Sequence, residues 1–207
     1  MYDASGLKKI EEWLGTGSIN IFGLPFAGKD TQGSMLAEAF NGVLISSGDI
    51  LRHDHGNQKV HDLMAAGAII PSELFLEIVI PYLSRSELQG RPLILSEVGR
   101  VQGEAEATLE ATKQSGHETK VVFFLNMPEQ EVWRRFDASQ QSHDRGPRED
   151  DNRNVLQNRL NRFREKVLPV IEFYRNSGLL VEIDGSLEKS LVTGQILRGL
   201  YDKSLGN

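Results

Sequence analysis

Short apolar runs alternate with longer amphipathic stretches along most of this chain. The run Ser18-Ile-Asn-Ile-Phe-Gly23 has the composition of a strand, and a turn with glycine and proline follows it. Residues 31–40 then have the composition of a helix. The same pattern predicts strands at residues 42–46, 91–96, 121–125 and 179–183, and helices at 71–88, at 103–115, from Pro128, at 152–174 and from about 187.

This alternation of strands and helices predicts the fold class. Parallel strands need a crossover connection, usually a helix, and such helices cover both faces of the sheet. We therefore expect an α/β protein with a doubly wound, five-stranded parallel sheet, formed by residues 18–207. Residues 1–17 precede the first strand and are expected to form an additional N-terminal helix.

Two segments interrupt the alternation. Residues 48–72 show no strand pattern and indicate short helices, so we expect a small helical insertion beside the sheet, at about residues 47–78. Residues 137–151 are polar and irregular in pattern. Such a segment suits a lid over a binding site better than a packed connection between elements.

The composition narrows the class of protein. With 207 residues, 39% hydrophobic and 25% charged, the chain fits one globular domain. No apolar run approaches the roughly 18 residues of a membrane span, and the amphipathic N-terminus does not resemble a signal peptide, so we expect a cytoplasmic protein without membrane contact. Without cysteine the chain has no disulfide and no Cys-based zinc site, and no zinc is expected. The net charge of −6 argues against nucleic acid as a partner.

The strongest chemical signal is the segment Gly23-Leu-Pro-Phe-Ala-Gly28-Lys29-Asp30-Thr31 between the first strand and the first helix of the sheet. Backbone N–H groups of such a loop bind phosphate oxygens, a lysine neutralises their charge, and a hydroxyl at the helix start can reach Mg²⁺. Lys29 and Thr31 are the candidates for these two roles, and Lys29 is expected to be solvated when no ligand is bound. The alternative is an ordinary turn between a strand and a helix.

The loop resembles the adenylate kinase family in detail, because that family has Lys-Gly-Thr-Gln where this chain has Lys29-Asp30-Thr31-Gln32. Further motifs follow in the family's order over roughly residues 18–200. They are Ser47-Gly48-Asp49-Ile-Leu51-Arg52, Ala66-Gly67-Ala-Ile-Ile70-Pro71-Ser-Glu73, Leu95-Ser96-Glu97-Val98-Gly99-Arg100, and Arg148-Glu-Asp150-Asp151 followed by Arg159-Leu160.

The resemblance implies phosphoryl transfer from ATP with Mg²⁺ to a nucleoside monophosphate, with AMP as the first choice, by a monomeric enzyme. Arginines would bind and neutralise the phosphates, since their planar fork binds phosphate in a bidentate manner. A lone arginine on a helix is more often a solvated surface residue. The implied catalytic residues are Lys29, Arg100, Arg135, Arg148 and Arg159.

The implied binding positions form two groups. Those for ATP are Gly23, Pro25, Ala27, Gly28, Lys29, Asp30, Thr31, Arg135 and Gly185, with Thr31 also the candidate ligand for Mg²⁺. Those for the acceptor are Ser47, Gly48, Arg52, Met64, Ile70, Gly99, Arg100 and Glu104. Gly185 follows the last strand and resembles the family's loop against the donor adenine, but a turn that simply ends the strand is an equal alternative.

Several residues depart from the family's pattern. Phe26 and Asp30 both stand where the family has glycine. We expect Phe26 to keep an ordinary backbone conformation with its ring outward, and Asp30 adds negative charge near a triphosphate. Ser96 replaces the carboxylate that ends the family's third strand and organises water around Mg²⁺; Glu97 can substitute only if the strand has already ended. These departures favour a rival class, a nucleotide-binding paralogue that has lost turnover.

Glu104 is compatible with more than one base on the acceptor nucleotide. Adenylate kinases have glutamine there, whose amide matches the donor and acceptor of adenine, whereas a carboxylate could accept both donors of guanine. A kinase for GMP, or for CMP or UMP, is therefore an alternative. Equally, Glu104 could turn to solvent or pair with an arginine.

Overall fold

The computed structural model describes residues 4–53, 58, 60, 62, 71–142 and 152–206. Five strands form one sheet: β1 (Ser18–Gly23), β2 (Val43–Ser46), β3 (Leu93–Ser96), β4 (Thr119–Asn126) and β5 (Leu180–Asp184). Their order is β2-β3-β1-β4-β5, and every neighbouring pair is parallel. The predicted α/β fold with a doubly wound, five-stranded parallel sheet is confirmed.

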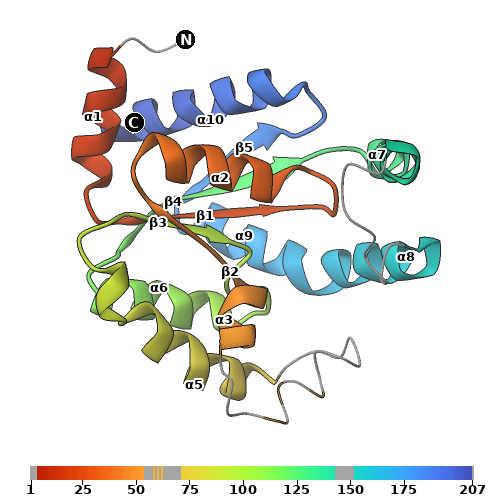
Figure 1. Ribbon diagram of the computed structural model, residues 1–207, viewed down its shortest axis with the longest axis horizontal. Helices are drawn as coiled ribbons and strands as arrows, with labels where there is room; N and C mark the ends of the chain where they lie inside the picture. Colours follow the sequence, from red (N-terminus) through yellow and green to blue (C-terminus); the bar gives the residue numbers. More distant parts are fainter. Residues whose placement is uncertain are drawn as a thin grey trace.

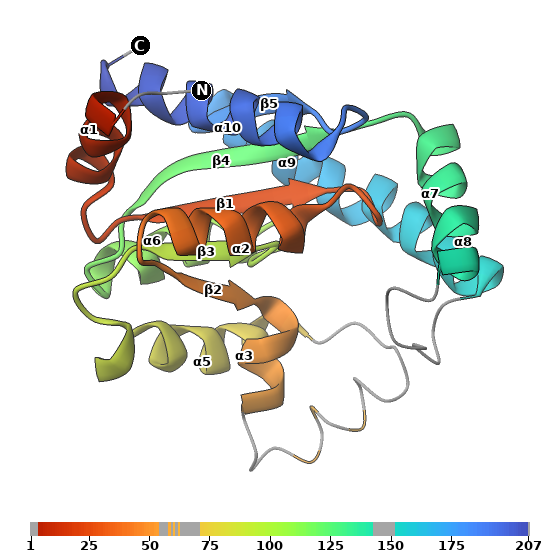
Figure 2. The same ribbon diagram turned by 45° about the horizontal axis from the view of Figure 1, so that its top comes forward.

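The helices cover both faces of this sheet (Figures 1 and 2). On one face α2 (Lys29–Ala39) contacts β1, β2 and β3, while α10 (Lys189–Ser204) contacts β4 and β5. On the other face α6 (Glu104–Gln114) contacts β4, α9 (Leu168–Asn176) contacts β5, and α5 (Ser72–Leu83) packs against α6. All six residues of β1 are buried, because this central strand has helices over both of its faces.

The helix predicted at residues 71–88 is shorter than expected. The α-helix α5 ends at Leu83, and a separate 3₁₀ helix, η1, spans Ser86–Leu88. Pro81 lies inside the last turn of α5, and the chain leaves the α-helix there through tighter bonds, from the N–H groups of Ser84 and Arg85 to the carbonyls of Pro81 and Tyr82. The other predicted helices and strands are found with boundaries shifted by a few residues.

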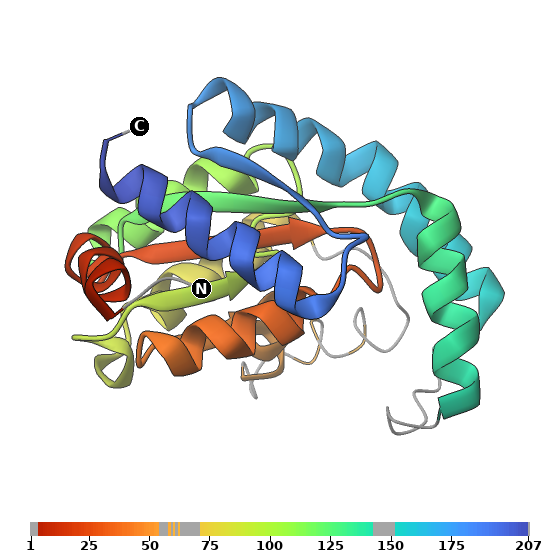
Figure 3. The same cartoon turned by 90° about the horizontal axis from the view of Figure 1, so that it is seen from above.

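Beyond the carboxyl ends of the strands, two helices extend away from the sheet (Figure 3). One is α7 (Glu129–Ser142), which continues into the segment predicted to be irregular from residue 137. The other is α8 (Arg153–Arg162), which passes through a π-helical turn, η2 (Phe163–Val167), into α9. Residues 143–151, the rest of the predicted lid, lie outside the described residues.

The N-terminal extension forms the helix α1 (Ala4–Leu14), which packs against α10 and buries Ile10 and Leu14 in the core. It leads directly into the start of β1 and lies at the amino ends of the strands (Figure 2). A short helix, α3 (Ser47–His53), follows β2 where the helical insertion is expected to begin. Within the part of the chain that the structure describes, every helix is too short or too polar to cross a bilayer.

Candidate functional site

A cavity of about 580 Å³ opens at the carboxyl ends of β1, β2 and β3, the edge where open α/β sheets bind their ligands. The loop of residues 23–31, which we call the phosphate loop, forms one wall. The loops after β2 and β3 form the second wall, and α8 with the π-helical turn η2 forms the third. The predicted site residues that line it are Gly23, Pro25, Gly28, Lys29, Asp30, Thr31, Ser47, Gly48, Arg100, Glu104 and Arg159.

The phosphate loop joins the end of β1 to the start of α2 in one tight turn. Ala27 N–H donates to the carbonyl of Leu24 at 3.1 Å, and Ala27 itself is buried in the core rather than facing the cavity. Gly28 precedes the helix with φ 88°, a left-handed conformation that glycine adopts without steric cost. The first turn of α2, with its unsatisfied backbone N–H groups, therefore borders the cavity and suits an anion.

Lys29 is held by the loop rather than solvated, so that part of the prediction is wrong. Its ammonium group donates to the carbonyl oxygens of Gly23 and Leu24 at 2.8 and 3.0 Å. It also lies 3.3 Å from a carboxylate oxygen of Glu97, and only 14% of its side chain is exposed. Without ligand, the lysine stabilises the shape of the phosphate loop.

The prediction for Phe26 is also wrong, in both backbone and side chain. Its φ is 63°, the left-handed region that bulky residues rarely adopt. The residue is partly buried at the edge of the cavity, and its ring packs edge-on against Phe136 of α7, with the ring centroids 5.7 Å apart. This aromatic contact offsets the backbone cost, which is about 1–2 kcal/mol for a non-glycine residue.

At the end of β3 two consecutive residues line the cavity, because the strand ends between them. Ser96 is the last strand residue, and its hydroxyl donates to Asp30 Oδ1 at 2.9 Å. Glu97 has φ 52°, which turns its side chain to Lys29. The strand has therefore ended before Glu97, which is the condition under which Glu97 can substitute for the family's carboxylate, and Glu97 lines the cavity. The Ser47 hydroxyl donates to the Glu97 carbonyl at 2.6 Å, which ties the loop after β2 to the loop after β3.

Side chains of β1 and α6 hold the loop that carries Arg100. The Asn20 amide donates to the Val98 carbonyl at 2.8 Å, and Glu104 Oε2 accepts from the backbone N–H groups of Arg100 and Val101 at 3.0 and 3.2 Å. Glu104 is only 4% exposed, so the alternative in which it turns to solvent is wrong. Gly99 lies beneath this loop with φ 78° rather than on the cavity wall. The arginine side chain itself is half exposed, 4.0 Å from Glu97.

The sequence analysis did not identify two cationic residues of the third wall. Arg162 and Lys166 line the cavity together with Arg159. Their spacing of three and then four residues places them on one face of a helix, and this was the signal that could have identified them. The cavity thus has positive charge on all three walls, from Lys29, Arg100 and this helix, which suits a polyanionic ligand.

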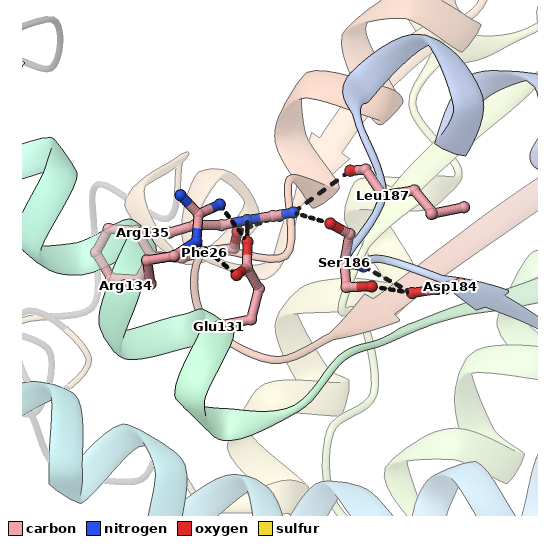
Figure 4. A network of polar contacts seen from close by, with 7 residues as sticks. All are labelled: Phe26, Glu131, Arg134, Arg135, Asp184, Ser186 and Leu187. Atoms are coloured by element: carbon pink, nitrogen blue, oxygen red, sulfur yellow. Dashed lines mark hydrogen bonds and ion pairs between the residues drawn. The ribbon is translucent and has the colours of Figure 1, made fainter.

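Arg135 lies outside this cavity, behind the phosphate loop (Figure 4). Its guanidinium donates to Glu131 Oε1 at 2.7 Å, to the carbonyl of Phe26 at 3.2 Å, and to those of Ser186 and Leu187 at 3.1 and 3.4 Å. It therefore joins α7, the phosphate loop and the loop after β5 into one unit.

The predicted ATP position Gly185 belongs to that loop after β5. Its N–H donates to the Asn126 carbonyl at 2.7 Å, and its neighbour Asp184 accepts hydrogen bonds from Ser186 that lower the pKa of the Asp184 carboxyl. Both observations describe a well-ordered turn at the end of the strand. Because Arg135 binds the same turn, a ligand that contacts Arg135 would also lie close to this turn.

Glu131 is the anchor of the Arg135 network. Hydrogen bonds from Arg134 and Arg135 lower the pKa of Glu131 from its ordinary value of 4.5 to about 2. We expect Glu131→Gln to lower the free energy of unfolding by about 1 kcal/mol at neutral pH. Since the folded pKa lies below the unfolded one, the difference from the parent should narrow as the pH falls below about 4.5 towards 2.

Thermal unfolding of both proteins across that pH range measures this effect. A matched control is Glu129→Gln, which removes a more exposed ion pair with Arg164 and should cost less. Equal losses for the two variants at neutral pH would contradict an anchoring role for Glu131.

Some predicted residues cannot be placed in the site. Arg52 belongs to α3, but its side chain is not among those described. Met64, Ile70 and Arg148 lie outside the described residues.

Comparison with known proteins identifies the family of the chain. The model of the adenylate kinase family matches residues 21–179 of the chain. The chain is 32% identical to an adenylate kinase of Deinococcus radiodurans, over 86% of this chain and 94% of the relative. It is 33% identical to one of Thermus thermophilus, over 81% and 88%. A third, from Dehalococcoides mccartyi, is 29% identical over 88% and 97%. With this coverage and the phosphate loop in place, the chain belongs to the adenylate kinase family of phosphotransferases.

Proposed function

We propose that this protein transfers the terminal phosphoryl group of ATP to AMP and releases two molecules of ADP. The observation that carries the proposal is that one cavity joins the phosphate loop with Lys29 to the loop with Arg100. A donor and an acceptor phosphate bound to these two loops would lie in the same cavity. Transfer between bound phosphates needs alignment and charge neutralisation rather than a covalent intermediate.

Each wall would perform one part of this work. The first turn of α2 and Lys29 would hold the donor phosphates, and Arg100 would bind the acceptor phosphate. Arg159 faces the cavity from α8 and would neutralise charge on the transferring group. Bound Mg²⁺ would supply further neutralisation of the phosphate oxygens, and the oxygen donors Thr31, Asp30 and Ser96 on the cavity wall suit this hard cation.

The remaining predicted residues belong to the same proposal. Arg148 would act from the lid at about residues 137–151, and Arg52, Met64 and Ile70 from the insertion at about residues 47–78. Arg135 and Gly185 would border the donor base, which is supported by their position beside the phosphate loop. We also propose that the enzyme works as a monomer.

A coupled assay for ADP formation tests the proposal. With ATP and Mg²⁺ held constant, kcat/KM is measured for AMP, GMP, CMP and UMP. AMP is expected to give the highest value. The absence of ADP formation with all four acceptors would overturn the proposal.

Glu104→Gln tests how the acceptor base is selected. Because Glu104 is buried and binds two backbone N–H groups of the Arg100 loop, we expect it to position that loop rather than read the base. The substitution should lower kcat/KM for all four monophosphates by a similar factor of about ten and leave their ranking unchanged. A parent that prefers GMP, together with a variant that prefers AMP, would show instead that the carboxylate contacts the base.

The rival class, a nucleotide-binding paralogue without turnover, rested on Phe26, Asp30 and Ser96. In the fold, Phe26 is accommodated by Phe136, and Asp30 is bonded to Ser96. These contacts support a working site, and the same assay separates the two classes, since a paralogue of this kind would bind ATP but form no ADP.

A further inference from the structure

The hydrogen bond between Ser96 and Asp30 joins two departures that are far apart in the sequence. Ser96 ends β3 and is 5% exposed, whereas Asp30 is an exposed residue in the first turn of α2. Their side-chain oxygens are 2.9 Å apart, and both residues line the cavity beside Lys29. The two substitutions therefore form a single pair.

Phosphate-loop enzymes generally hold Mg²⁺ with a hydroxyl and a carboxylate from two different segments. The hydroxyl belongs to a serine or threonine directly after the loop lysine, and the carboxylate is an aspartate from a neighbouring strand. In the adenylate kinase family a glycine follows the lysine and the threonine stands one residue later, where this chain keeps Thr31. Here an aspartate, Asp30, stands at the glycine position, and a serine, Ser96, ends the neighbouring strand where the family has the carboxylate. The pair still holds one carboxylate, one hydroxyl and the hydrogen bond between them.

We propose that the carboxylate role has moved from the end of β3 to the start of α2, so that Asp30 supplies the carboxylate that binds or orients Mg²⁺ and Ser96 positions it, while Thr31 keeps the hydroxyl role. The inference rests on the proposed function, because it needs ATP phosphates in the same cavity. It explains why a negative charge stands beside a loop that binds polyanions. Without a cation, the Asp30 carboxylate repels the phosphates. When Mg²⁺ is bound between them, the cation attracts both groups.

Glu97 is the competing carboxylate, and its contacts argue against it. It lies 3.3 Å from Lys29 and 4.0 Å from Arg100, so two cations already balance its charge. Asp30 instead accepts a hydrogen bond from a neutral hydroxyl, which leaves its charge intact. Mg²⁺ is usually bound through one or two carboxylates together with substrate phosphates and water, so a single aspartate is sufficient.

Calorimetric titration with the β,γ-imido analogue of ATP, in Mg²⁺ and in EDTA, tests the inference. The quantity compared is the ratio of the Kd in EDTA to the Kd in Mg²⁺. We expect Asp30→Asn to lower this ratio about 10- to 100-fold. The change has two parts of opposite sign, because the variant should bind the analogue more tightly than the parent in EDTA and more weakly in Mg²⁺.

Two further variants make the test specific to these residues. The double variant Asp30→Ser with Ser96→Asp returns the carboxylate to the strand and should restore most of the ratio. Glu97→Gln should change both Kd values by a similar factor and keep the ratio. Electron paramagnetic resonance of Mn²⁺ in the complex with ATP provides a direct measure, and the Kd of Mn²⁺ should rise in Asp30→Asn.

The outcomes separate this inference from the proposed function. If Asp30→Asn keeps the parent ratio and the parent Kd for Mn²⁺, or if Glu97→Gln loses them instead, the assignment of the carboxylate role to Asp30 is wrong while ATP binding stands. If the folded parent binds the analogue in neither buffer, the proposed function fails, and the inference fails with it.

Discussion

Replacement of Lys29 by methionine is expected to lower kcat about 100- to 1,000-fold, the usual cost of removing one group that stabilises transition-state charge. Methionine keeps most of the length and packing of the side chain but has no positive charge. The KM for AMP should change much less, because Lys29 belongs to the loop proposed to hold the donor phosphates, whereas Arg100 is the proposed ligand of the acceptor phosphate. Steady-state kinetics of ADP formation measures both constants.

The same substitution should also lower the thermal midpoint, for a reason visible only in the structure. It removes the nearer of the two cations beside Glu97, and the donor to two loop carbonyl groups, from a largely buried position. The double variant with Glu97→Gln removes the carboxylate that has lost its nearer cation, and it should recover part of the midpoint but none of the rate. A Lys29→Met enzyme with half of the parent kcat would show that this residue has no catalytic role.

Substitution of Gly99 by alanine is expected to lower the free energy of unfolding by about 3 kcal/mol and the thermal midpoint by about 6–12 °C. The φ of 78° is unfavourable for alanine, and its Cβ would lie 2.7 Å from the Thr108 hydroxyl and 3.0 Å from the Glu104 carbonyl. Relief of these contacts would move Glu104, which holds the loop of Arg100. We therefore expect kcat/KM for AMP to fall as well.

Gly90→Ala is the matched control, because Gly90 has nearly the same φ, 77°, and open space where its Cβ would be. It should lose only the backbone term of about 1 kcal/mol. The difference between the two variants then measures the steric part at Gly99. Equal midpoints for both variants would show that the packing beneath the Arg100 loop is not tight.

The order of the elements could be predicted because the sequence alternates between two clear patterns. Strands such as β1 and β4 carry apolar runs and are almost continuously buried, since helices cover both of their faces. The phosphate loop was identified by its glycines and Lys29 at the end of one such strand. These signals are local, and each needs only a few neighbouring residues.

The details of the site depend on contacts between residues far apart in the sequence, which a local pattern does not contain. Phe26 keeps its left-handed backbone because Phe136, on a distant helix, receives its ring. Glu97 enters the site because β3 ends one residue before it, and Asp30 has its partner in Ser96. To predict Arg162 and Lys166, one must know which face of their helix borders the cavity.

The central place of β1 in the sheet has a consequence for synthesis of the chain. Its two neighbours are β3 and β4, which are both translated much later. At about 5–20 residues per second, residue 126 follows residue 23 by about 5–20 s. Until β3 is reached at residue 93, after about 4–14 s, a strand that is wholly buried in the fold has neither of its partners, and until β4 is complete it has only one. Chains interrupted before β4 would leave one edge of this buried strand unpaired, and unpaired strand edges are templates for aggregation.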